Sequence, residues 1–303
     1  MTRFYLITGF LGAGKTTFLR QILEGFAGEK VSVIVNDFGR ERVDAALLSR
    51  QGIVLEEINN GSIFCACRAE QFREALEHVL DREPDVIFTE ASGLADPTHL
   101  NAVLQWQDAG RLSLVGTVCL VDAVRFHKVR DTARVVRQQL AAADGIVLNK
   151  IDLASPEQRA AIRAELELLC PDIPVIETSY SRVPGQWLRA LRPAPLREDG
   201  SAPPHRRDIT LQKLTLRLED TLTLPRLRAF LEAVAGDTYR IKGFAALEGT
   251  LTRIDCVGKL ICVSPWDGAV RDLGKVTVLY GNGLPARRAI QAALERDPIG
   301  VLE

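Results

Sequence analysis

The chain has 303 residues, of which 47% are hydrophobic and 25% charged, and its formal net charge is -1. These values are ordinary for a soluble globular protein with two domains or one large one. They argue against a nucleic-acid binder that relies on a broad basic surface. No apolar run approaches the roughly 18 residues that a membrane span needs.

Two further features bear on location. The first expected strand begins almost at the N-terminus and leaves no room for a signal peptide. Six cysteines in a chain of this length do not form a disulfide scaffold. We therefore expect a cytoplasmic protein.

Strands and helices alternate through residues 1–192. Short apolar runs predict strands at 3–8, 31–36, 53–58, 85–89, 112–121, 145–148 and 173–176. Apolar residues at helical spacing predict helices at 15–26, 69–82, 97–107, 132–143, 156–169 and 187–191. This alternation indicates an α/β fold with a mainly parallel sheet covered by helices on both faces.

The pattern changes after a proline-punctuated, charged stretch at 193–207, which we interpret as a linker. Residues 208–303 then predict a smaller α+β domain with an antiparallel sheet. Its expected strands lie at 209–218, 239–247, 250–257, 259–263 and 276–280, and its expected helices at 224–234 and 285–295.

A phosphate-binding loop is predicted between the first strand and the first helix. The stretch Gly9-Phe10-Leu11-Gly12-Ala13-Gly14-Lys15-Thr16 fits Gly-x-x-x-x-Gly-Lys-[Ser/Thr]. Glycines let the backbone wrap closely round a triphosphate, and the helix N-terminus supplies positive potential. The candidate nucleotide contacts here are Gly9, Gly12, Ala13, Gly14, Lys15, Thr16 and Thr17. A chance glycine-rich turn is the alternative.

The base is predicted from Asn149-Lys150-Ile151-Asp152, an Asn-Lys-x-Asp tetrad at the end of an expected strand. In GTPases the Asp carboxylate accepts hydrogen bonds from both N1–H and the N2 amino group of guanine. Adenine lacks that pair of donors and would leave the carboxylate unpaired. The tetrad therefore favours GTP over ATP. It also argues against another possible function, that of a small-molecule kinase.

Catalytic candidates lie at other strand ends. Glu90 is in the Walker-B position and would hold Mg²⁺ together with the Thr16 hydroxyl, while the Gly93 N–H would contact the γ-phosphate. Leu94 stands where Ras-like enzymes carry a water-orienting Gln. Asp37 is the remaining candidate to position the water or the metal, although a turn-forming role is equally consistent. We therefore expect slow intrinsic hydrolysis, with Lys15, Asp37, Glu90 and Gly93 as the catalytic set.

A transition-metal site is the least determined feature. Cys65 and Cys67 would face the same side of an extended segment and could hold a soft or borderline metal such as Zn²⁺. An unliganded or redox-active pair fits equally well, because a closed zinc site needs two further ligands. The other cysteines lie in apolar runs and are expected in the core, and they are Cys119, Cys170, Cys256 and Cys262.

Taken together, the motifs resemble those of the CobW-type GTPases, relatives of UreG and HypB. The matching segments are GFLGAGKTT at 9–17, VNDFG at 35–39, EASGLADP at 90–97, QQLAAADGIVLNKIDL at 138–153 and YRIKGF at 239–244. The resemblance covers nearly the whole chain. It implies GTP and Mg²⁺ as ligands, and a metallochaperone or metal-centre maturation role with Zn²⁺, Co²⁺ or Ni²⁺. It also implies a metalloprotein or metallocofactor client, and a homodimer as one form of assembly.

One departure from the family concerns the metal. The family typically has Cys-x-Cys-Cys after the Asn-Gly turn, whereas this chain has Ser62, Phe64 and Cys65 at those positions and an extra Cys67. The metal site has therefore either shifted to Cys65 and Cys67 or been lost. If it has been lost, the alternative is a GTP-dependent activase or interaction switch that remodels a corrinoid or other metalloenzyme client without carrying metal.

Overall fold

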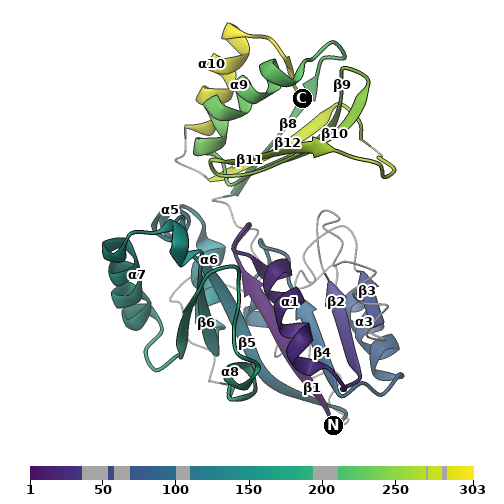
Figure 1. The fold of residues 1–303 in the computed structure, drawn as a ribbon, viewed down its shortest axis with the longest axis vertical. Helices are drawn as coiled ribbons and strands as arrows, with labels where there is room; N and C mark the ends of the chain where they lie inside the picture. Colours follow the sequence, from purple (N-terminus) through teal and green to yellow (C-terminus); the bar gives the residue numbers. More distant parts are fainter. Residues whose placement is uncertain (36–53, 58–68, 100–109, 194–210, 271, 282–284) are drawn as a thin grey trace. The chain divides into compact units, whose positions relative to one another are not determined.

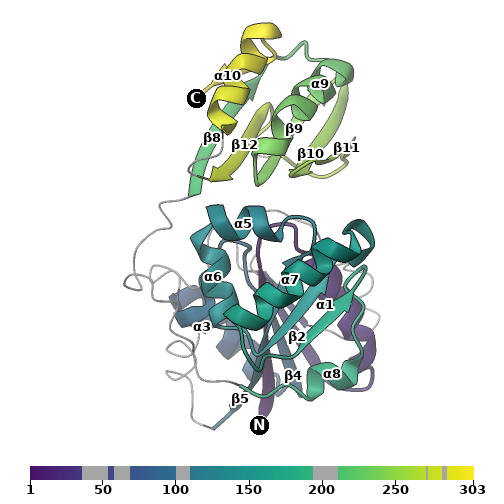
Figure 2. The same ribbon diagram turned by 90° about the vertical axis from the view of Figure 1, so that its left-hand side faces the viewer.

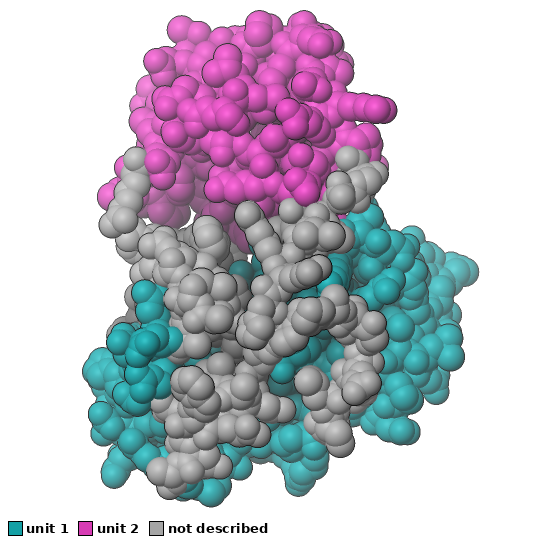
Figure 3. All heavy atoms as spheres, turned by 180° about the vertical axis from the view of Figure 1, so that it is seen from behind, with its two compact units in different colours: residues 1–206 teal, residues 207–303 magenta. Residues whose placement is uncertain are grey.

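The computed structural model describes residues 1–35, 54–57, 69–99, 110–193, 211–270, 272–281 and 285–303 (Figure 1). The chain divides into two compact units, Met1–Arg206 and Arg207–Glu303, which Figure 3 shows in different colours. Among the described residues, no helix combines the length and the apolar character that crossing a bilayer requires.

The first unit is built on a parallel sheet. In the described part of the unit, seven strands lie in the order β3-β2-β4-β1-β5-β6-β7, and every pair is parallel. The strands are β1 (Thr2–Gly9), β2 (Val31–Val35), β3 (Val54–Glu57), β4 (Val86–Glu90), β5 (Leu112–Asp122), β6 (Gly145–Asn149) and β7 (Val175–Thr178). This order confirms the predicted parallel α/β fold.

Helices cover both faces of this sheet (Figure 2). The alternation along β1 explains why: Tyr5 and Ile7 belong to the core beneath α1 and α8, whereas Phe4 and Leu6 belong to the core beneath α3. All four side chains are at most 1% exposed. The helices are α1 (Lys15–Leu23), α3 (Ala69–Leu80), α5 (Phe126–Thr132), α6 (Arg134–Ala141), α7 (Pro156–Leu169) and α8 (Gly185–Arg189).

The helix predicted at 132–143 is confirmed as α6, which is two residues shorter at each end. The preceding helix α5 was not predicted, and Ala133, which is extended with φ -129° and ψ 105°, separates it from α6. The predicted helix at 15–26 ends in a 3-10 turn, Glu24–Phe26. Of the helix predicted at 97–107, the described part is a 3-10 turn, Pro97–His99, and residues 100–107 lie outside the described residues.

The second unit is an α+β domain, as predicted. Its six strands lie in the order β11-β10-β9-β12-β8-β13, and every pair is antiparallel. The strands are β8 (Leu211–Leu218), β9 (Arg240–Leu247), β10 (Thr250–Val257), β11 (Leu260–Pro265), β12 (Lys275–Gly281) and β13 (Gly300–Leu302). Side chains of α9 (Leu224–Val234) and α10 (Ala286–Arg296) share one core with the sheet. The short strand β13 has no counterpart among the predicted elements.

The segment YRIKGF at 239–244 has a structural explanation in this sheet. Tyr239 is fully buried, and the Arg240 guanidinium binds the Asp255 carboxylate at 2.9 Å. Gly243 lies so close to β12 that a Cβ there would be 2.3 Å from the carbonyl oxygen of Lys275. A residue larger than glycine at this position would push β9 and β12 apart.

Candidate functional site

The polar residues predicted at strand ends meet at the carboxyl edge of the parallel sheet. Glu90 ends β4, Asp122 ends β5 and Asn149 ends β6. Asp122 and Asn149 are register partners on adjacent strands, and Asn149 in turn pairs with Thr178 at the end of β7. In open parallel sheets this edge is where ligands bind.

The P-loop lies between β1 and α1, as the motif predicts. Gly9, Gly12 and Gly14 have φ of 133°, 77° and 105°, in a region that other residues rarely adopt. The Lys15 ammonium donates to the carbonyl oxygens of Gly9 at 2.8 Å and Phe10 at 3.3 Å. This places a buried positive charge inside the loop, where P-loops hold phosphates.

The structure brings the predicted Mg²⁺ ligands together. The Thr16 hydroxyl donates to Glu90 Oε1 at 2.9 Å, although the two residues are 74 positions apart in the sequence. Glu90 is 5% exposed. A hydroxyl and a carboxylate are oxygen ligands of the kind that Mg²⁺ prefers, so the residues present fit that ion.

The loop after Glu90 rests on the P-loop. A Cβ built on Gly93 would lie 2.7 Å from the backbone nitrogen of Leu11. Gly93 is buried, and Thr17, the third residue of α1, is exposed. The predicted γ-phosphate contact therefore lies directly against the P-loop backbone.

The Asn149 side chain connects the segment predicted to recognise guanine to the P-loop. Its Nδ2 donates to the carbonyl oxygen of Ala13 at 2.9 Å and to Ser181 Oγ at 2.8 Å. Its Oδ1 accepts the Ser181 N–H at 2.9 Å, and Ser181 Oγ donates to the carbonyl oxygen of Gly14 at 3.2 Å. Asn149 is 3% exposed and Ser181 is fully buried. The segment predicted to read the base and the loop predicted to hold the phosphates are therefore one hydrogen-bonded unit.

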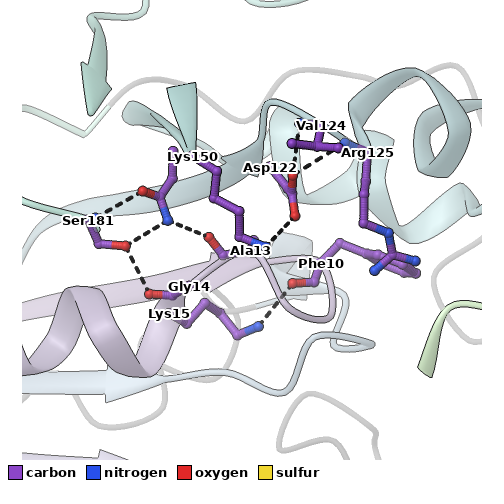
Figure 4. Close-up of polar contacts among 10 residues, drawn as sticks. Phe10, Ala13, Gly14, Lys15, Asp122, Val124, Arg125, Lys150 and Ser181 are labelled. Atoms are coloured by element: carbon purple, nitrogen blue, oxygen red, sulfur yellow. Dashed lines mark hydrogen bonds and ion pairs between the residues drawn. The ribbon is translucent and has the colours of Figure 1, made fainter. Parts of the chain in front are cut away.

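Lys150 follows in a left-handed conformation, with φ of 65°. Its ammonium binds Asp122 Oδ2 at 2.6 Å, and Asp122 Oδ1 accepts the backbone N–H groups of Val124 and Arg125 (Figure 4). Asp152, in the 3-10 turn Ile151–Leu153, is exposed, as a residue that reads an incoming base must be.

Two residues of this site escaped the sequence interpretation. Ser181 lies just beyond β7, in a segment without a spaced motif, and Gln139 is a 1% exposed polar residue in α6. The only sequence signal for Ser181 is its place after an expected strand end. Gln139 lies in the matching segment 138–153, but nothing in that match gave it a role.

Asp37, Cys65 and Cys67 lie outside the described residues. Within the described ranges, no group of three or more His, Cys, Asp or Glu side chains is arranged to hold a metal ion. Burial raises the pKa of Cys119 above its ordinary value and the pKa of Cys256 to about 12. Cys119, Cys170 and Cys256 are buried, as expected. The expectation for Cys262 is wrong, because it is exposed.

The junction between P-loop and Asn149 gives a testable prediction for Gly14→Ala. The new Cβ would lie 2.5 Å from Asn149 Nδ2 and 2.8 Å from Ser181 Oγ. We expect GTP affinity, measured by titration, to fall by roughly tenfold or more, since the clash separates the two halves of the site. The matched control is Gly28→Ala, which also has positive φ, 91°, but meets nothing within 4 Å. It should lower the melting temperature and leave GTP affinity unchanged; equal losses in both variants would contradict the prediction.

Comparison with known proteins agrees with this geometry. Residues 3–177 match the family model described as CobW/HypB/UreG, nucleotide-binding domain, and residues 211–296 match the cobalamin synthesis protein cobW C-terminal domain. A Pseudomonas aeruginosa protein named Zinc chaperone CobW is 31% identical over 301 residues, which cover 82% of this chain and 78% of that protein.

Two further likenesses involve one Escherichia coli protein. Zinc chaperone YjiA is 35% identical over 162 residues, which cover 51% of this chain and 51% of that protein. The crystal structure of Zn(II)-bound YjiA GTPase shares the fold with a TM-score of 0.50 at 22% identity, covering 97% of this chain and 98% of that one. The matched models cover both units, and the chain belongs to the CobW/HypB/UreG family of P-loop GTPases, with a CobW-type C-terminal domain.

Proposed function

We propose that this chain binds GTP with Mg²⁺, hydrolyses it slowly, and couples its nucleotide state to the delivery of a metal, Zn²⁺ first, to a metalloprotein or metallocofactor client. The observation that carries the nucleotide part is the hydrogen bond from Asn149 Nδ2 to the carbonyl oxygen of Ala13. It fixes the base-reading segment at a set distance from the phosphate loop, so that one guanine nucleotide can contact both.

Each end of the nucleotide has its own contacts in this proposal. Asp152 accepts the guanine N1–H and N2 amino hydrogens, and the Lys150 stem packs along the base. The Lys15 ammonium exchanges its backbone carbonyl partners for the β- and γ-phosphates. The backbone of Gly12–Gly14, with the N-terminus of α1, cradles the phosphates.

Thr16 and Glu90 would hold the Mg²⁺, which neutralises charge on the transferred phosphoryl group. Water is oriented by Asp37 or by the backbone, because Leu94 has no group that can hydrogen-bond it. The water-orienting side chain that Ras-like enzymes have at this position is therefore missing, which is the reason we expect slow hydrolysis without a partner. Rapid turnover by the purified protein alone would contradict this.

The metal part draws on the relatives. The Pseudomonas aeruginosa and Escherichia coli proteins are named zinc chaperones, and a Schizosaccharomyces pombe relative, 31% identical over 189 residues, is named Zinc-regulated GTPase metalloprotein activator 1. In this chain Cys65 and Cys67 lie between Asp37 and Gly93 in the sequence. If that stretch rearranges when the nucleotide changes, the affinity of the two cysteine thiolates for the metal would change with it.

Zinc titration of the purified protein tests the proposal. Binding is measured without nucleotide, with GDP, and with a non-hydrolysable GTP analogue, all with Mg²⁺. We expect Zn²⁺ affinity to differ about tenfold or more between the diphosphate and triphosphate states, a coupling of about 1.4 kcal/mol. The double variant Cys65→Ser with Cys67→Ser should lose this Zn²⁺ binding.

The matched control is Cys262→Ser, which removes an exposed thiol from the second unit. It should leave Zn²⁺ affinity and its nucleotide dependence unchanged. Equal Zn²⁺ affinity in all nucleotide states would refute the coupling. No Zn²⁺ binding at all, together with a client captured in one nucleotide state, would support the activase alternative instead.

A further inference from the structure

We infer that Gln139 is a positioning residue for the γ-phosphate: it holds the turn that follows the Walker-B glutamate in place against the P-loop, so that this turn can distinguish GTP from GDP. The inference rests on the proposed function and assigns one part of that function to a helical residue that the sequence motifs gave no role.

The contacts of Gln139 are directed at the backbone of that turn. Its Nε2 donates to the carbonyl oxygen of Gly93 and to that of Ala95, both at 3.2 Å. The two carbonyls come from a turn closed by the hydrogen bond from the Ala95 N–H to the Ser92 carbonyl oxygen at 2.9 Å. The Gln139 side chain, which is 1% exposed, therefore satisfies two backbone acceptors that lie about 45 residues earlier in the chain.

The neighbouring residue makes a different kind of contact. Gln138 Nε2 donates to the Asp96 carboxylate at 2.5 Å, and Asp96 Oδ1 accepts the Thr98 N–H at 3.0 Å. Gln138 is only half-buried. Gln138 therefore contacts the side chain of Asp96, which follows the turn, whereas the Gln139 side chain contacts backbone carbonyl groups of the turn itself.

The opposite side of the turn lies on the P-loop. Gly93 approaches Leu11 so closely that a Cβ would be 2.7 Å from the Leu11 nitrogen and 2.8 Å from its Cδ2. The turn is thus held between the P-loop on one side and α6 on the other. The turn directly follows Glu90, the last residue of β4, and Glu90 accepts a hydrogen bond from Thr16 of α1. A γ-phosphate bound in the P-loop would therefore contact the backbone of this turn, and Gln139 sets the orientation of that backbone.

The test compares nucleotide affinities rather than stability. Gln139→Met keeps the length of the side chain and removes both donors. Titrated with Mg²⁺ and a non-hydrolysable GTP analogue, it should bind the triphosphate about tenfold more weakly than wild type, and GDP within about twofold, since two hydrogen bonds to the turn are lost. Gln139→Glu, which points acceptors at two carbonyls, should lower triphosphate affinity further.

The matched control is Gln138→Met, which should change the ratio of the two affinities by less than about twofold, because the turn backbone keeps both its bonds to Gln139. Parallel losses for GDP and the triphosphate in Gln139→Met would assign it a structural role and overturn the inference, as would an unchanged ratio. Failure of the wild-type chain to bind either nucleotide would instead overturn the proposed function itself.

Discussion

Lys15→Ala is expected to weaken GTP binding by roughly 100- to 1,000-fold and to remove measurable hydrolysis. The ammonium is the positively charged side chain inside the loop, and hydrogen bonds between charged groups and phosphate are worth about 1.5–3 kcal/mol each. Its removal also leaves the carbonyl oxygens of Gly9 and Phe10 without this donor. Fluorescent GTP-analogue titration and phosphate release measure the two effects.

Lys30→Ala is the matched control, because Lys30 is exposed and lies just before the start of β2, away from the carboxyl edge of the sheet. It removes the same charge and should leave GTP affinity within about twofold of wild type. Circular dichroism of both variants verifies that they fold. A Lys15→Ala protein that still bound GTP as wild type does would contradict the assignment of this loop.

The second large effect is expected from Asp152→Asn. In the proposed site guanine would present two donors to the Asp152 carboxylate, whereas xanthine would present an acceptor that an amide can satisfy. GTP affinity should fall by roughly 100-fold, and affinity for xanthosine triphosphate should rise in the variant, since a mismatched site leaves polar groups unpaired. Competition titration with GTP, ATP and xanthosine triphosphate separates base recognition from general loss of binding.

Because Asp152 is exposed, its replacement should not alter stability. The control is Asp172→Asn, another exposed aspartate, at φ of 66°, a left-handed position that Asn tolerates well. It should leave the base preference unchanged. An Asp152→Asn protein with an unaltered preference for GTP would show that guanine is read elsewhere.

Sequence patterns predicted the parts of the fold that depend on local periodicity and strand-end chemistry. Short apolar runs predicted the strands of both sheets. The glycines predicted the P-loop, because its backbone adopts positive φ angles that glycine allows. Helix α5 and the break that separates it from α6 were not predicted, because Ala133 has high helix propensity and its extended conformation comes from tertiary context.

Long-range hydrogen bonds explain what the sequence could not reveal about the site. Ser181 and Gln139 act on backbone atoms 167 and about 45 residues away, and no spacing motif records such contacts. Cys262 was assigned to the core from its apolar neighbours, but strands alternate, and its side chain lies on the exposed face. Local pattern therefore identifies what a site contains more readily than what holds it together.

The bonds that Asn149 and Ser181 make to Ala13 and Gly14 have a consequence for how long a nucleotide stays bound. If a guanine nucleotide spans both parts as proposed, its base and its phosphates are bound by one connected piece of backbone. Replacement of Asn149 or Ser181 should then change the lifetime of the bound nucleotide as well as its affinity.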